Sequence, residues 1–244
     1  MGQTLDIGKA QSLGRRQRQE DRIAVLPGGL LVLSDGMGGA VGGDVAAETI
    51  VGVVTEALKD SAAAGSALRN AAMAANKALR LRTRDEPDLE GMGGTVVIVR
   101  VVEEGALYFS MGDSPLWRVR GGRAERLNAD HSVGGMLDAQ VDRGELSAEE
   151  AMSRRDRNSI TSVLTGAAVK GMRMDETADA IPMSAGEVLV LASDGLDTLT
   201  PDQIAEVVER GGGAQQIADA LIAAVETVDK PRQDNCSVIV TRIA

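Results

Sequence analysis

The chain has 244 residues, a formal charge of −10, aromatic residues at 1% of positions and one cysteine, Cys236. The acid excess and the lack of aromatics argue against nucleic-acid binding, which depends on clustered Lys and Arg and on stacking platforms. The lone cysteine excludes an internal disulfide framework and is typical of a protein in the reducing cytoplasm.

No segment has the features of a membrane anchor or of a secretion signal. No apolar run approaches the roughly 18 residues that a membrane span requires, and the N-terminus lacks a basic-then-apolar signal pattern. The sequence also shows no internal repeat and no long low-complexity linker. We therefore expect a cytoplasmic protein with no membrane span, organised as one domain over residues 1–244.

The first predicted elements are a hairpin and two helices. Apolar, β-branched runs at residues 21–26 and 29–34 flank a Pro-Gly turn and predict two antiparallel strands. In residues 44–59 and 66–82, apolar side chains recur every three or four positions, which indicates amphipathic helices.

More strands and a less regular stretch follow. Strand-like runs cover residues 95–102, 106–111 and 116–120, and turns that contain Gly are predicted at residues 103–105 and 121–122. The stretch 134–165 is predicted to be irregular, except for one short helix that Ser147 could cap.

The C-terminal part is predicted to be strand, two helices and strand. A strand is expected at residues 187–191, and a capping box at Thr200 starts the first of the two helices. Residues 214–228 predict the second helix, and residues 237–242 the last strand. Because strands and helices are segregated along the chain, the order predicts an α+β fold, with two packed antiparallel β-sheets flanked by helices.

Four aspartates share one local pattern, because each lies beside the end of a strand-like run and next to Gly or Asn. They are Asp35, Asp113, Asp194 and Asp234. A single Asp-Gly is more often a turn than a ligand, so the inference depends on all four together. Carboxylates that converge at strand ends form a hard-oxygen site suited to Mg²⁺ or Mn²⁺. Zinc calls for Cys or His ligands, and this chain has only one of each.

The segment that begins at Asp35 is rich in glycine, with the sequence Asp-Gly-Met-Gly-Gly over residues 35–39. Glycine permits positive φ angles and close approach of the backbone. A metal ion could therefore be bound by the Gly36 carbonyl as well as by the Asp35 carboxylate.

Several short motifs follow one another along the chain. They are Arg16-x-x-x-Glu20-Asp21, Asp35-Gly36-Met37-Gly38-Gly39, Gly93-Gly94-Thr95, Gly112-Asp113-Ser114, Asp130-His131-Ser132, Ser193-Asp194-Gly195-Leu196 and Asp234-Asn235. Their types and order resemble those of the type 2C (PPM) metal-dependent serine/threonine protein phosphatases, and of bacterial-type members in particular. Each motif is weak alone, and the ordered series from about Gly14 to Thr241 carries the resemblance.

The resemblance implies a hydrolase with a centre of two Mn²⁺ or Mg²⁺ ions, and a third ion bound more weakly. Asp35 would bridge the two ions, and the Gly36 carbonyl would bind one of them. Asp194 and Asp234 would be the remaining direct ligands, and Asp113 would help to bind the third ion.

The resemblance also implies roles around the metal ions. Glu20 and Asp21 would hold waters of the ions, and Arg16 would bind the substrate phosphate. A water activated by the two ions would attack phosphorus in line, with no phosphoenzyme. Met37 stands where many eukaryotic relatives carry a His that has been proposed as general acid, so the acid is left unassigned. The only histidine, His131, is expected to make a structural hydrogen bond.

The implied substrates are phosphoserine and phosphothreonine in proteins, which places the chain opposite a Ser/Thr kinase in signal transduction. The stretch 134–165 aligns with the family's variable flap beside the active site. The main alternative is a catalytically inactive pseudophosphatase that acts as a phosphoprotein-binding module. Such members typically lose one or more metal-binding aspartates, and all of them are present in this sequence.

Overall fold

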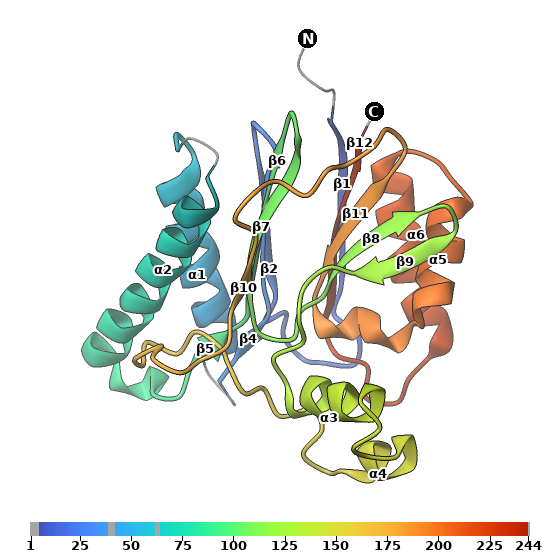
Figure 1. Cartoon of the computed structure of the whole chain (residues 1–244). Coiled ribbons are helices and arrows are strands. Elements are labelled where there is room, and N and C mark those ends of the chain that lie inside the picture. The colour runs from blue at the N-terminus through green and yellow to red at the C-terminus, as the bar shows by residue number, and fades with distance from the viewer. Residues whose placement is uncertain (1–4, 39–41, 62–63, 244) are drawn as a thin grey trace.

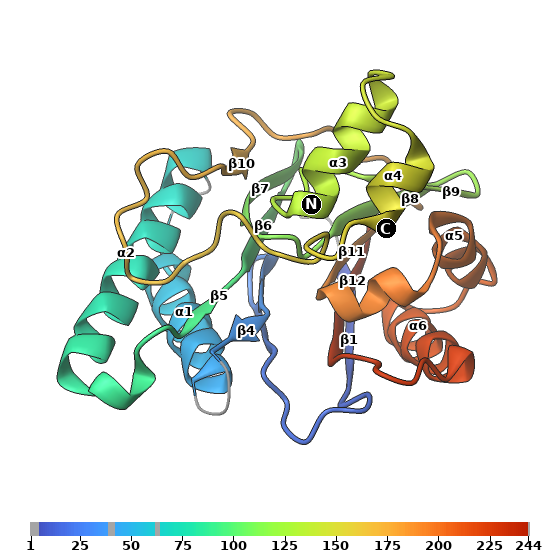
Figure 2. The same ribbon diagram turned by 90° about the horizontal axis from the view of Figure 1, so that it is seen from below.

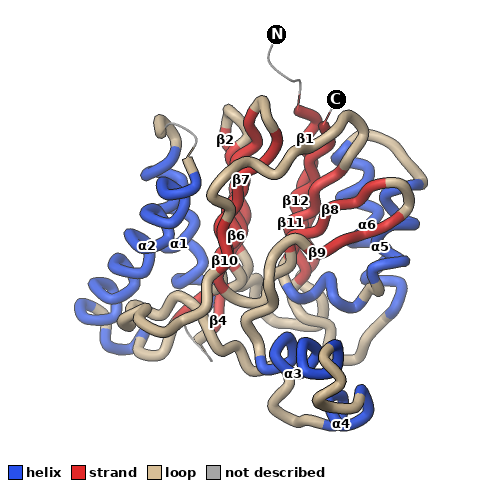
Figure 3. Tube along the Cα trace, viewed as in Figure 1, coloured by secondary structure: helices blue, strands red, loops and turns tan. Residues whose placement is uncertain are grey.

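Two five-stranded antiparallel sheets lie face to face, and helices cover both outer faces (Figure 1). The computed structural model describes residues 5–38, 42–61 and 64–243. Helices, strands and loops are distinguished in Figure 3, where the strands form the inner layers and the helices the outer ones. The predicted α+β fold of two packed sheets flanked by helices is confirmed.

The two sheets are assembled from strands that are distant in sequence. Sheet I has the order β1 (Leu5–Ser12), β12 (Cys236–Ile243), β11 (Val188–Ala192), β8 (Leu116–Arg120) and β9 (Arg123–Arg126). Sheet II has the order β10 (Asp175–Glu176), β7 (Gly105–Met111), β6 (Val96–Val102), β3 (Leu30–Ser34) and β2 (Arg22–Leu26). A two-residue ladder pairs β4 (Gly36–Met37) with β5 (Gly93–Gly94).

The helices form one layer on each side and a cap at one end. Sheet II is covered by α1 (Gly43–Leu58) and α2 (Gly65–Asp85), and sheet I by α5 (Pro201–Glu209) and α6 (Ala214–Val228). The pair α3 (Val133–Asp142) and α4 (Ala148–Ser153) lies below the sheets in Figure 1. Two short 3₁₀ helices are η1 (Pro87–Leu89) and η2 (Asp194–Thr198). None of the helices within the described ranges is long and apolar enough to cross a bilayer.

Central strands read as unbroken apolar runs because both of their faces are covered. In β3, Leu30 and Val32 pack into the cluster beneath α1 and α2, whereas Leu31 and Leu33 pack between the two sheets. All four side chains are fully buried. The seven predicted strands and the four predicted long helices are all present, with ends shifted by at most a few residues.

Strand β1 is absent from the elements predicted above, although it pairs with β12 along its whole length. Its sequence, LDIGKAQS, has only two large apolar residues and contains a glycine, so the strand signal is weak. Gly8 has a packing reason, since a Cβ there would lie 2.3 Å from the backbone of Gln215 in α6. The contact with α6 therefore selects a residue with poor strand propensity.

The prediction of an irregular stretch over 134–165 is wrong in part, because α3 occupies its beginning. Ser132 caps this helix by accepting a hydrogen bond of 3.0 Å from the Gly135 amide. The sequence of α3 lacks a clear helical pattern of apolar residues, because it contains two glycines and buries only Gly134 and Leu137. The short helix expected after Ser147 is confirmed as α4, with a complete capping box.

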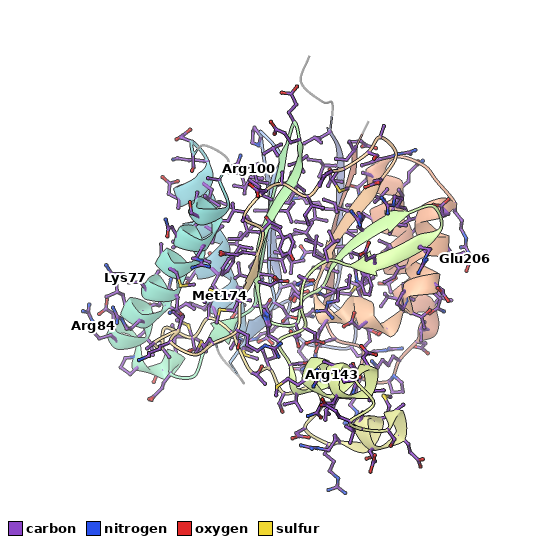
Figure 4. All side chains as sticks on the ribbon, viewed as in Figure 1. Lys77, Arg84, Arg100, Arg143, Met174 and Glu206 are labelled. Atoms are coloured by element: carbon purple, nitrogen blue, oxygen red, sulfur yellow. The ribbon has the colours of Figure 1, made fainter. Side chains whose placement is uncertain are left out.

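Arg100 is a buried cation on β6, the central strand of sheet II, and is labelled in Figure 4. Its Nη2 donates to the Leu58 carbonyl at the C-terminal end of α1 at 2.7 Å, and its Nη1 donates to the Gly28 carbonyl at 3.3 Å. Burial lowers the pKa of the guanidinium. Arg100 thus satisfies one carbonyl of a helix end and ties α1 to the turn between β2 and β3.

Replacing Arg100 with methionine should keep most of the apolar stem and remove these donors. We expect the free energy of unfolding in urea to fall by about 1–3 kcal/mol, the usual cost of leaving buried acceptors without a donor. The control is Arg84→Met on the exposed face of α2, which should change this free energy by less than about 0.5 kcal/mol. Equal stability of the two variants would contradict the role given to Arg100.

Candidate active site

The predicted site residues meet at one end of the sandwich, which Figure 2 views from below. Asp35 follows β3 and Asp113 follows β7 in sheet II, whereas Asp194 follows β11 and Asp234 precedes β12 in sheet I. These four aspartates line one pocket of about 390 Å³. Arg16, Glu20, Gly36 and Met37 also line it. Asp21 lies behind this pocket and is 1% exposed.

Asp35 is the electrostatic centre of the cluster. Burial raises the pKa of its carboxyl well above the ordinary value, and the charges of Asp21, Asp194, Asp113 and Asp234 raise it further. Five carboxyl groups from both sheets are therefore close enough to disfavour one another's ionisation.

The neighbouring carboxyls show the same pattern. Burial, with a smaller effect of Asp234, raises the pKa of Asp194 to about 6, although a hydrogen bond with Asp35 opposes this. The pKa of Asp113 rises to about 7 through burial and through the charges of Asp194 and Asp130. These groups can be brought to full ionisation at neutral pH by a nearby positive charge.

Asp21 is held rigidly by two hydroxyl groups. Ser193 Oγ and Ser237 Oγ donate to its Oδ2 at 2.8 Å and 2.6 Å. Burial raises its pKa to about 6, while these two hydrogen bonds lower it. Since Ser193 follows β11 and Ser237 lies in β12, the strands of sheet I fix the position of this carboxylate.

At this cluster, three buried carboxylate oxygens, on Asp21, Asp113 and Asp194, have no hydrogen-bond partner among the described residues. An ionised oxygen that is buried without a partner costs several kcal/mol in free energy. A divalent cation would offset this cost, and Mg²⁺ or Mn²⁺ is suited to an all-oxygen donor set. The chemistry of the donors therefore fits the metal ions that the sequence predicts.

Asp234 has both carboxylate oxygens engaged. Its Oδ2 accepts a hydrogen bond from the Arg16 guanidinium, and its Oδ1 accepts one of 2.8 Å from the Asn235 amide. The contact with Asp234 raises the pKa of Arg16. Within the described ranges, no three His, Cys, Asp or Glu side chains form a complete ligand set as they stand. As the structure stands, Asp234 is ion-paired with Arg16.

Glycine is required where the chain crosses from β3 to α1. A Cβ on Gly36 would lie 2.0 Å from the Gly43 carbonyl oxygen, and one on Gly43 would lie 2.8 Å from Glu20 Oε1. The start of α1 therefore packs directly against the predicted metal-binding loop and against Glu20. Burial raises the pKa of Glu20, and its amide donates to Asn235 Oδ1 at 2.8 Å. Gly39, the last residue of the glycine motif, lies outside the described residues.

His131 has the structural role expected of it. It is 1% exposed, and its Nδ1 accepts a hydrogen bond of 3.2 Å from the Gly112 amide, beside Asp113. Burial lowers its pKa, so the ring is neutral and serves to position the Gly112–Asp113 turn. Cys236 is fully buried, and burial raises the pKa of its thiol, as suits a structural residue.

Asp197 is a site residue that the motifs did not single out. It lies with Asp113 and Asp194 in an adjoining pocket, and burial raises its pKa to about 6. The signal was its spacing, because side chains three residues apart point the same way on a 3₁₀ helix. Asp194 and Asp197 are so placed on η2.

The sequence matches the family described as protein phosphatase 2C over residues 10–235. The chain belongs to this family. The serine/threonine phosphatase stp of Listeria monocytogenes is 28% identical over 217 residues, which is 86% of this chain and 82% of that protein. The crystal structure of the Mycobacterium tuberculosis phosphatase PstP/Ppp has a TM-score of 0.82 and 29% identity, with 98% of both chains covered.

A further structure, of the catalytic domain of the phosphatase PstP, contains two manganese ions. It is 28% identical, has a TM-score of 0.81 and again covers 98% of both chains. The resemblance to bacterial-type phosphatases of this family is confirmed, and the chain is a protein phosphatase.

The raised carboxyl pKa values predict how the stability of the metal-free protein, kept in EDTA, depends on pH. Asp113 has a folded-state pKa of about 7 and an unfolded value near 4, so the folded form retains a proton that the unfolded form releases. Its contribution to stability is complete below about pH 4 and is lost as the pH rises to 7.

We therefore expect Asp113→Asn to become more stable relative to the wild type between pH 5 and 7.5, by about 1–3 kcal/mol. Urea unfolding of both proteins in EDTA measures this difference, with Asp60→Asn on the loop after α1 as control. A difference that stays constant over this pH range would show that Asp113 has no raised pKa.

Proposed function

We propose that this phosphatase hydrolyses phosphoserine and phosphothreonine in other proteins, using two Mn²⁺ or Mg²⁺ ions held by Asp35, Asp194 and Asp234. The observation that carries the proposal is the cluster of strand-end aspartates with unpartnered oxygens and raised pKa values. The two manganese ions in the related PstP catalytic domain support the choice of metal. When bound, the ions would lower the pKa of a shared water and offset charge on the phosphoryl group.

The ligands come from rigid positions. Asp35, at the end of β3, feels the charges of carboxyls from both sheets and would be suited to contact both ions, with the Gly36 carbonyl beside it. Asp113, whose Oδ1 is buried and unpartnered, is suited to help hold a third ion. The Asp21 carboxylate is fixed by the two serine hydroxyls, and the Glu20 backbone by its hydrogen bond to Asn235, so the free carboxylate oxygens of both residues can orient water.

Arg16 is suited to hold the substrate phosphate at the rim of the pocket. Its side chain is 54% exposed and already contacts a carboxylate of the cluster, so it can reach an anion bound there. The guanidinium stays protonated, and its planar fork can donate to two phosphate oxygens. Met37 lines the same pocket and has no proton to donate, so it only shapes the wall.

The rest of the assignment follows from this activity. The partners would be phosphoproteins made by a Ser/Thr kinase, in signal transduction. Residues 1–244 would act as one catalytic domain, with the segment 134–165, including α3 and α4, as a flap beside the pocket. The single buried cysteine supports a cytoplasmic location. The alternative, a pseudophosphatase that only binds phosphoproteins, is disfavoured because every expected aspartate lies at the cluster.

Asp194→Asn should abolish turnover while leaving the fold intact, because it removes a charged ligand but keeps the size of the side chain. We expect phosphate release from a phosphothreonine peptide in Mn²⁺ to fall more than about 100-fold, since even the partners of ligands are worth 10–100-fold. Circular dichroism checks the fold, and Asp60→Asn is the control. If Asp194→Asn turns over the peptide as fast as the control, the assignment of Asp194 as a metal ligand is wrong. If the wild type shows no turnover, the pseudophosphatase is favoured.

A further inference from the structure

A second pocket, of about 670 Å³, adjoins the candidate active site and shares Asp113, Asn158 and Asp194 with it. The flap contributes Gly134, Asp138, Met152 and Arg157 to its lining, and η2, the start of α5 and Lys230 contribute a further part. This volume is in the range of ligand-binding clefts. A polypeptide whose phosphorylated residue reaches the aspartate cluster has room for its neighbouring residues here.

The basic side chains along the two pockets are mostly paired within the protein. The basic side chains that line them are Arg16, Arg126, Arg157 and Lys230. Each of the three arginines contacts a carboxylate, on Asp234, Asp130 and Asp138 respectively. The Lys230 ammonium makes no hydrogen bond or ion pair with any described residue. It is the cation along this cleft that is free to meet an external anion.

Lys230 is carried by a turn that is firmly attached to the site. Asp229 ends α6 in the left-handed conformation, with φ of 51°, and the Gln233 amide donates to the Lys230 carbonyl at 3.0 Å. The Gln233 side chain is buried; it donates to the Gly195 carbonyl at 3.0 Å and accepts from Thr198 Oγ1 at 2.6 Å. The turn is thereby fixed to η2, which carries Asp194.

The position of this turn brings the Lys230 charge to the acidic cluster. Lys230 is among the charges that lower the pKa of Asp194 and of Asp197, although burial raises both values overall. Among the described residues, the other charges lining this second pocket without an ion-pair partner are the carboxylates of Asp113, Asp194 and Asp197. A negative group next to the phosphorylated residue would therefore be repelled unless a free cation met it. A lysine, with its compact charge on a flexible stem, suits anions at slightly different positions.

We propose that Lys230 is a specificity-determining residue that binds an anionic group of the substrate polypeptide, a carboxylate or a second phosphate, beside the residue being dephosphorylated. This inference rests on the proposed function and adds a substrate class to it. The preferred substrates are phosphoproteins whose phosphorylated residue is flanked by acidic or phosphorylated side chains.

The test compares two phosphothreonine peptides that differ only in having Glu or Gln at the flanking positions. We expect the wild type in Mn²⁺ to favour the Glu peptide by about three- to five-fold in kcat/KM, the size of an exposed charge pair, with most of the effect in KM. Lys230→Ala should bring this ratio close to one, and Lys230→Glu should invert it. Added salt should shrink the preference of the wild type.

The matched control is Lys77→Glu, the same charge reversal on an exposed lysine of α2, in the helix layer on the other side of the molecule (Figure 4). It should leave the preference for the Glu peptide unchanged. A third peptide carries a phosphonate analogue of phosphoserine at the flanking position, which a phosphatase cannot hydrolyse. It separates the two anion sources, since a larger preference than for Glu identifies a second phosphate.

The proposal is overturned if Lys230→Ala and Lys230→Glu keep the wild-type ratio, or if they lose activity equally on both peptides. Failure of the proposed function is a separate result, namely no metal-dependent hydrolysis of either peptide by the wild type. In that case the role of Lys230 is still tested by binding. The two peptides are labelled with a fluorophore, and their dissociation constants are measured by fluorescence anisotropy. Tighter binding of the Glu peptide that Lys230→Glu reverses supports the inference, and equal binding overturns it.

Discussion

Carboxylates that are crowded together away from water repel one another. The rest of the fold must hold them together against this repulsion. Five aspartates from two sheets meet at one end of the sandwich, and the pKa of Asp35 at their centre is raised by its burial and by all four of the others. Such a cluster is costly in a protein of net charge −10 unless cations offset it. A hard divalent cation bound among these carboxylates would offset the same cost.

The sandwich supplies the rigidity that the cluster needs. Asp35 and Asp113 follow strands of sheet II, and Asp194 and Asp234 flank strands of sheet I, so the packing of the sheets sets the distances between their carboxylates. That packing is a layer of mainly aliphatic side chains, and such a layer is close-packed and tolerates little displacement. The Lys230 turn is attached to the same framework through Gln233, which places a free cation beside the cluster.

Much of this architecture can be predicted from local patterns in the sequence. Strands buried on both faces read as continuous apolar runs, and an aspartate at the end of each run predicts a shared oxygen site. Strand β1 was not predicted because its contact with α6 requires glycine at position 8, which weakens the strand signal. Helix α3 was not predicted because its buried face is narrow. The pairing of Arg16 with Asp234 joins residues 218 positions apart. Such long-range contacts, like the isolation of Lys230, depend on tertiary packing that no local pattern encodes.

The central claim is that Asp35, Asp194 and Asp234 together bind two divalent cations. The most direct measurement is anomalous diffraction at the manganese absorption edge from crystals of this protein grown with Mn²⁺. The account predicts two strong peaks within about 2–2.5 Å of carboxylate oxygens, with Asp35 contacting both. Peaks elsewhere on the protein, or no peaks at the cluster despite Mn²⁺ in the crystal, would contradict it.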